Sequence, residues 1–224
     1  MYVPAHFAAD VGEVRELLIQ QGAADLVTAT ATGLTATLLP FLYAPTVGEH
    51  GSLLGHVARN NDQWRHEVLG DALVIVRGPD AYISPSWYAS KAEHGRVVPT
   101  WNYVTAHIYG RLVVHDDPDW VGALVRRLTD RYEADNPLRW SVDDAPAAFV
   151  AGQLRAIVGV ELVISRVEAK AKLSQNRSPT GTNSHDVYGD VACETPLGNN
   201  GSRRGWQLGR RVWAGSETPC AKNL

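Results

Sequence analysis

Cysteine is scarce in this chain, and histidine is never clustered. The two cysteines, Cys193 and Cys220, both lie near the end, so the body of the chain has neither a disulfide framework nor a thiolate metal site. The eight histidines are scattered singly, and the H-E-x-x-H pattern of zinc proteases is missing. These absences argue against a thiolate metal site and against a zinc protease of this kind.

The familiar nucleotide-binding and hydrolase motifs are missing as well. There is no G-x-G-x-x-G, no P-loop and no G-x-S-x-G, and no pair of side chains stands out as an acid and a base. If the chain is an enzyme, we expect a bound cofactor to supply its reactivity.

The chain also has no large excess of one charge and no long apolar run. The formal net charge of −3 gives no reason to expect a nucleic-acid-binding surface, and no apolar run approaches the length of a membrane span. The N-terminus lacks a basic region followed by an apolar one, so we expect no secretory signal and a cytoplasmic location. The 224 residues suit one large globular domain, or one domain with an appendage.

Aromatic residues, by contrast, are concentrated between Tyr82 and Tyr109. Pro85 and Pro99 interrupt this stretch, because each removes a backbone donor from any regular sheet. Broad aromatic faces beside a strand and a loop can frame a flat ligand, or they can fill a β core. Composition alone leaves both interpretations open.

Hydrophobic periodicity predicts an α+β fold with a largely antiparallel sheet or barrel. We expect helices at 10–21, from 117 onward and at 145–157, and strands at 24–31, 34–43, 51–58, 71–78, 100–115 and 158–167. The first helix begins with a capping box of Asp10 and Glu13. Because most helices come late, a repeated βαβ plan is disfavoured.

One turn, residues 55–65, combines groups suited to a phosphate. Any of residues 60–62 can cap a short helix, Arg59 lies beside it, and His56 is on the strand before it. The free N–H groups of a first helical turn, together with a guanidinium, bind anions. The alternative is an ordinary capped turn with a solvated arginine.

Several longer stretches resemble one known family. They are MYVPAHF, TATLLP, GHVARNNDQW, GPDAYISPSWY, VPTWNYVTAHIYGRL and KLSQNR, in this order from Met1 to about Arg177. These motifs resemble the PaiB-type FMN-binding negative transcriptional regulators. The resemblance implies a split β-barrel with peripheral helices, like that of pyridoxamine-phosphate oxidases and small flavin reductases. It also implies a homodimer with FMN in clefts between the two subunits.

Nine residues in or beside these motifs are the candidate cofactor ligands: Thr37, His56, Arg59, Asn60, Trp87, Tyr88, Trp101, Lys172 and Gln175. Arg59 is the expected phosphate ligand, with His56 and Asn60 beside it. Lys172 and Gln175 are expected to donate to further oxygens of FMN. The three aromatic residues are expected to border the isoalloxazine ring or to close the cleft, and the threonine lies on a strand expected to face the flavin.

Two functions are compatible with the resemblance. A regulator would bind operator DNA, although residues 1–176 hold 15 Lys and Arg against 20 Asp and Glu and show no basic stripe. We therefore expect any direct DNA affinity to be weak and sensitive to salt. The alternative is an FMN-dependent oxidoreductase, of the flavin reductase or pyridoxamine-phosphate-oxidase kind, that takes electrons from a nicotinamide cofactor.

The resemblance ends at Arg177, so residues 1–177 are the expected FMN-binding domain. Residues 178–224 contain seven glycines and show no sustained periodicity. We interpret them either as a poorly ordered extension or as the product of a frameshift near Ser178 that replaces the usual ending of the family.

Overall fold

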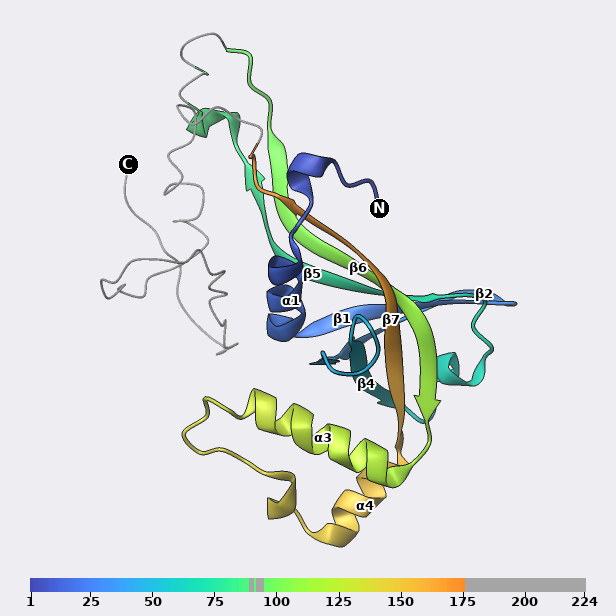
Figure 1. Cartoon of the computed structure of the whole chain (residues 1–224). Helices are drawn as coiled ribbons and strands as arrows, with labels where there is room; N and C mark the ends of the chain where they lie inside the picture. Colours follow the sequence, from blue (N-terminus) through green and yellow to red (C-terminus); the bar gives the residue numbers. More distant parts are fainter. Residues whose placement is uncertain (89–90, 92–94, 176–224) are drawn as a thin grey trace.

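The computed structural model describes residues 1–88, 91 and 95–175 of the chain (Figure 1). The predicted tail, residues 178–224, lies outside the described residues. The elements in chain order are η1 (Ala5–Phe7), α1 (Val11–Gln20), β1 (Ala23–Thr30), β2 (Gly33–Pro40), β3 (Leu42–Ala44), β4 (Ser52–Ala58), η2 (Asp62–Arg65), β5 (Ala72–Ile83), η3 (Pro85–Trp87), β6 (Thr100–His115), α3 (Pro118–Tyr132), η4 (Val142–Asp144), α4 (Ala147–Arg155) and β7 (Ile157–Lys172).

The strands form one antiparallel sheet in the order β2-β1-β5-β6-β7-β4-β3. β2 and β3 lie at its opposite edges, although only Phe41 separates them in the chain. One residue cannot bridge the two edges of a flat sheet, so the sheet must curl until its edges approach each other. Phe41 is fully buried, and a Cβ on Gly55 of β4 would lie 2.7 Å from Leu39 of β2. The predicted split β-barrel of α+β class is therefore confirmed.

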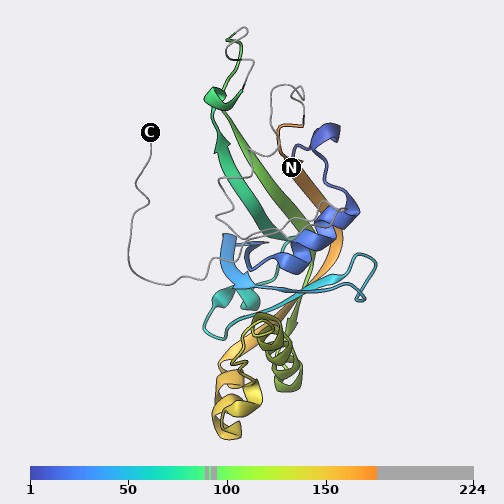
Figure 2. The same cartoon turned by 90° about the vertical axis from the view of Figure 1, so that its left-hand side faces the viewer.

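Three strands continue beyond the barrel as an extension that we call the arm, residues 80–83, 100–105 and 170–172. β5 has 12 residues, and β6 and β7 have 16 each. Their far ends lie together at one end of the molecule, opposite α3 and α4 (Figure 1, Figure 2). The N-terminal segment lies along the arm, where Ala8 forms a bridge with Lys170.

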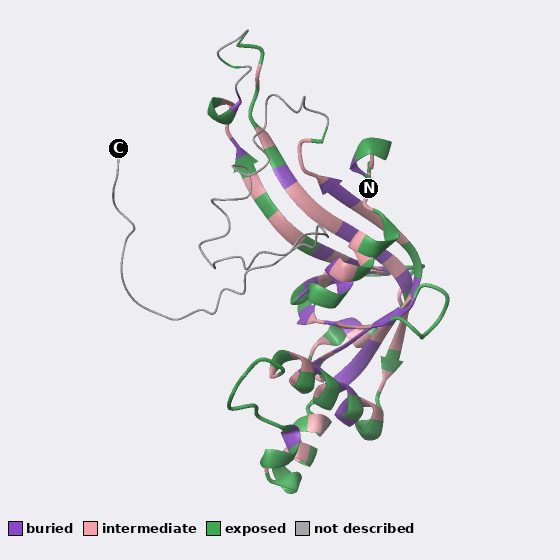
Figure 3. Cartoon of the chain, turned by 60° about the vertical axis from the view of Figure 1, so that its left-hand side comes forward, coloured by how far each residue is buried: buried purple, intermediate pink, exposed green. Residues whose placement is uncertain are grey.

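The main hydrophobic core fills the barrel. It is formed by alternate side chains of the strands and by Leu17 and Leu18 of α1, and Figure 3 shows this alternation of buried and more exposed residues along the ribbon. α1 begins with the predicted capping box, in which Asp10 and Glu13 each accept the other's backbone N–H. This helix therefore starts where the sequence places it.

α3 packs against the outer face of β4 and β7. Leu124 and Leu128 of this helix form a second, smaller core with Leu54 of β4. Trp120 lies so close to β7 that a Cβ on Gly159 would be 2.3 Å from the indole ring. Among the described residues, no helix is long and apolar enough to span a membrane.

The strand predicted at 71–78 is longer in the structure. A bulge between Arg77 and Asp80 takes up the Gly-Pro pair, and pairing with β6 then resumes as far as Ile83. A bulge can hold a proline because it removes a residue from the hydrogen-bonded ladder. The Gly-Pro pair therefore bends β5 rather than ending it.

Other boundaries range from correct to wrong. The strand at 100–115 is confirmed, whereas the strand predicted at 34–43 is divided at Phe41. The strand predicted at 158–167 continues to Lys172, because β6 offers it a partner along the whole arm.

Candidate functional site

The nine candidate ligands fall into two groups. The corner group lies where β2 and β4 approach the start of β7: Thr37, His56, Arg59 and Asn60. The tip group lies at the far end of the arm: Trp87, Tyr88, Trp101, Lys172 and Gln175.

β7 runs from one group to the other. Arg59 donates a hydrogen bond to the carbonyl of Ile157, the first residue of this strand, and Lys172 is its last. Sixteen residues at about 3.3 Å each make a strand of roughly 50 Å. This length far exceeds that of one flavin, so a single copy of the chain does not bring the two groups together.

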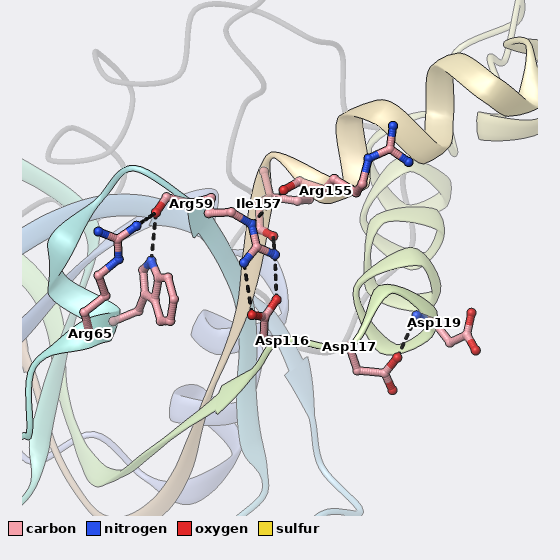
Figure 4. A network of polar contacts seen from close by, with 8 residues as sticks. Arg59, Arg65, Asp116, Asp117, Asp119, Arg155 and Ile157 are labelled. Carbon is pink, nitrogen blue, oxygen red and sulfur yellow. Dashed lines mark hydrogen bonds and ion pairs between the residues drawn. The ribbon is translucent and has the colours of Figure 1, made fainter.

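The backbone of Arg59 fixes the turn between β4 and η2. Its N–H donates to the carbonyl of Ala156 at 2.8 Å. Its carbonyl accepts from Trp64 Nε1 and from Arg65 Nη2, both at 3.1 Å (Figure 4). Asn60, the next residue, is exposed. The turn therefore holds the Arg59 side chain at the start of β7.

The guanidinium of Arg59 is also engaged within the chain (Figure 4). Its Nη1 and Nη2 donate to the two carboxylate oxygens of Asp116, at 3.0 and 2.5 Å. Its Nε donates to the carbonyl of Arg155 at 2.7 Å, and Nη2 also donates to that of Ile157 at 3.2 Å. The hydrogen bond from Arg59 lowers the pKa of Asp116, so this carboxylate stays ionised at neutral pH.

Thr37 and His56 face opposite sides of the sheet. Thr37 lies opposite Leu26 of the core, and its hydroxyl accepts from Asn61 Nδ2 at 2.9 Å. His56 lies opposite Gly159, on the outer face that α3 covers. Burial lowers the pKa of His56, and its Nδ1 is buried without a hydrogen-bond partner among the described residues. A buried nitrogen of this kind remains open to a ligand or a water.

The two indoles of the tip group are half exposed. Trp87 in η3 is 51% exposed and Trp101 in β6 is 52% exposed. Trp101 Nε1 donates to Asp80 at 2.9 Å, and its ring lies 6.2 Å from that of Tyr82. Tyr88, by contrast, is 4% exposed. Trp87 and Trp101 therefore offer faces to a flat ligand, while Tyr88 supports the tip from within.

Lys172 and Gln175 hold the end of β7. Lys172 Nζ donates to Thr100 Oγ1 and, at 2.6 Å, to the carbonyl of Trp101. Gln175 Nε2 donates to the carbonyl of Ala171 at 2.5 Å, and its Oε1 accepts a backbone N–H at 2.7 Å. These contacts close the turn that follows the strand.

The sequence reasoning missed three residues that the structure brings to these groups. Asp116 is the carboxylate partner of Arg59. Asn102 is buried beside the tip, where its Oδ1 accepts from Ser174 Oγ at 2.9 Å and its Nδ2 has no hydrogen-bond partner among the described residues. Ser174, in the turn after β7, has a φ of 67°, which is uncommon for a residue other than glycine. Asn102 could have been found, since it is the one polar residue on the inward side of its predicted strand.

The chemistry of these residues fits FMN. An arginine can neutralise a phosphate, exposed indoles can lie against a flat ring system, and buried amide or imidazole nitrogens can bond to ring oxygens and nitrogens. The curled antiparallel sheet and these donors define a flavin-binding split-barrel protein.

Comparison with known proteins identifies the family. A family model described as "Putative FMN-binding domain" matches residues 1–166, so the chain belongs to this family, whose cofactor is FMN. Protease synthase and sporulation protein PAI 2 of Bacillus subtilis (strain 168) is 35% identical over 184 residues, which cover 80% of this chain and 84% of that protein. An uncharacterised protein of Emericella nidulans is 28% identical over 214 residues, covering 78% and 84%. The resemblance to PaiB-type proteins is thereby confirmed.

Solved structures share the fold. The flavocytochrome Anf3 from Azotobacter vinelandii has a TM-score of 0.56 at 14% identity, covering 92% of this chain and 89% of that one. The FAD and heme binding protein from Mycobacterium smegmatis has a TM-score of 0.52 at 14% identity, covering 89% and 91%. At this level of identity the likeness shows the fold alone.

Proposed function

We propose that the chain binds FMN non-covalently between two copies of itself, with the tip group of one copy facing the corner group of the other. The observation that carries this proposal is the separation of the two groups by the whole of β7. A second copy in the opposite orientation offers a corner to each tip. A twofold dimer of this kind forms two equivalent sites.

An exposed apolar face of the sheet supports the dimer. Ala36 of β2, Val27 of β1 and Leu73 of β5 lie side by side in the register and point outward. Leu34 and Leu38, on the same side of β2, are 80% and 66% exposed. Adjacent apolar residues on an open sheet face are typical of a surface that another protein covers.

We infer further that the protein acts as a regulator of the PaiB kind, with FMN as its bound sensor. The relative from B. subtilis carries a name that links it to protease synthesis and sporulation. One observation counts against a DNA-binding regulator and so favours the alternative, an oxidoreductase that uses a nicotinamide cofactor. Six of the described arginines are already paired with carboxylates. Together with the excess of 20 acidic over 15 basic side chains in residues 1–176, such pairing weakens the attraction of the chain for DNA phosphates.

A subunit-complementation experiment tests the shared site. Copies carrying Arg59→Ala and copies carrying Trp101→Ala are co-expressed with different tags, and the mixed dimer is isolated. Each variant alone should bind FMN weakly, since both of its sites lack one group. The mixed dimer should regain one intact site per dimer, measured as bound FMN by absorbance after gel filtration.

Two results would contradict the proposal. A mixed dimer that binds no more FMN than its parents would place both groups in separate sites, and a monomeric protein that binds FMN tightly would remove the need for a partner. Asp143→Asn, which changes an exposed ion pair of α3 outside both groups, serves as the matched control for expression and folding.

A further inference from the structure

The Arg59 guanidinium has two sides with different partners (Figure 4). On one side, Nε and Nη2 donate to the main-chain carbonyls of Arg155 and Ile157. On the other side, Nη1 and Nη2 donate to both oxygens of Asp116. Guanidinium groups bind carboxylates and phosphates through the same pair of parallel N–H bonds. Asp116 therefore occupies the side of Arg59 that would receive two phosphate oxygens.

The two carbonyls would keep Arg59 in place if Asp116 moved away. The Asp116 side chain is 52% exposed, so its released carboxylate would be hydrated. α3 would remain capped, because Asp117 and not Asp116 accepts the N–H of Asp119 at 3.0 Å. Release of Asp116 would cost only the free energy of an exposed ion pair, which is small.

We propose that Asp116 competes with the flavin phosphate for Arg59 and so sets how strongly the protein prefers FMN to riboflavin. In the free protein, Asp116 neutralises Arg59 and repels other anions. The phosphate of FMN takes the place of this carboxylate, while both carbonyl contacts persist. Riboflavin has no phosphate, so its binding leaves the ion pair intact. This inference rests on the proposed FMN site and deepens it.

Replacement of Asp116 should change the affinity for FMN but not the affinity for riboflavin. Asp116→Asn keeps the shape of the side chain and removes its charge. In titrations followed by flavin fluorescence, the variant should bind FMN about two- to fivefold more tightly, the size of an exposed ion pair, and riboflavin as the unchanged protein does. Asp116→Ala is the second variant and should shift the two affinities in the same way.

Asp143→Asn is the matched control. It removes a comparable exposed pair, between Arg126 and Asp143 at 2.7 Å, and should change neither affinity. Weaker FMN binding by Asp116→Asn would mean that Asp116 orients Arg59 for the phosphate, and unchanged binding would mean that it plays no part. Either result overturns the inference. If the unchanged protein binds neither flavin, the proposed function itself fails, so the two failures are distinguishable.

Discussion

At the scale of single residues, Arg59 illustrates how a predicted ligand can also be a structural side chain. Its four side-chain hydrogen bonds join the turn before η2 to the end of α4, to the start of β7 and to Asp116, which follows β6. Because pairing lowers the pKa of Asp116, the ion pair is present at neutral pH and is lost only as the pH falls through that lowered pKa. The local sequence indicated a turn with Arg59 beside it. It could not indicate that Asp116 pairs with Arg59, because Asp116 lies 57 residues away in the chain.

The phosphate assignment gives a direct prediction at this scale. Arg59→Ala should weaken FMN binding by roughly ten- to a hundredfold, the effect of losing a charge-assisted hydrogen bond of about 1.5–3 kcal/mol. Riboflavin serves as the internal control. Its binding would be weakened by any loss of protein structure, but it has no phosphate to lose a contact. Titration of both flavins against the variant measures the difference. Equal weakening of both would remove Arg59 from the phosphate site.

At the scale of elements, the sequence predicted where helices begin better than it predicted how strands pair. The capping box at Asp10 is confirmed, and so is the helix start at residue 117, where Asp117 caps α3 and Pro118 is its first residue, since a cap depends on residues two or three apart. The break at Phe41 and the bulge after Arg77 were missed, because both depend on strands distant in the chain. The same applies to the site: the motifs named both groups, but only the length of β7 shows how far apart they lie.

The contact of α3 with β7 gives a prediction for a single methyl group. Gly159→Ala would place a Cβ 2.3 Å from the ring of Trp120, so the helix or the strand must shift. Overpacking of this kind should lower the free energy of unfolding by about 1–3 kcal/mol, measured by denaturant titration. Gly22→Ala is the control, because a Cβ there meets no atom within 4 Å. Equal stability of the two variants would contradict the tight packing of Trp120.

At the scale of the whole molecule, the barrel and the arm have different roles. The sheet curls so that its edge strands approach each other on either side of Phe41, and one copy encloses the main core. The arm carries two half-exposed indoles away from the corner group, and the neighbouring sheet face exposes Leu34 and Leu38. In the dimer proposed above, a second copy completes each site, and cofactor binding would then depend on association.

The charge of the whole molecule gives the last prediction, which concerns DNA. Residues 1–176 carry 15 basic against 20 acidic side chains, and six of the described arginines are paired with carboxylates. DNA affinity depends on free Lys and Arg that neutralise phosphates, so at an ionic strength of about 0.15 M we expect only non-specific binding, with Kd of about 10⁻⁴–10⁻⁶ M. A salt-titrated binding measurement on the protein's own promoter provides the check, and the affinity should fall further as salt is added. Tight and sequence-selective binding at that ionic strength would show that two copies gather basic residues that one copy keeps apart. Oxidation of NADH or NADPH with FMN present, without DNA binding, would instead favour the oxidoreductase.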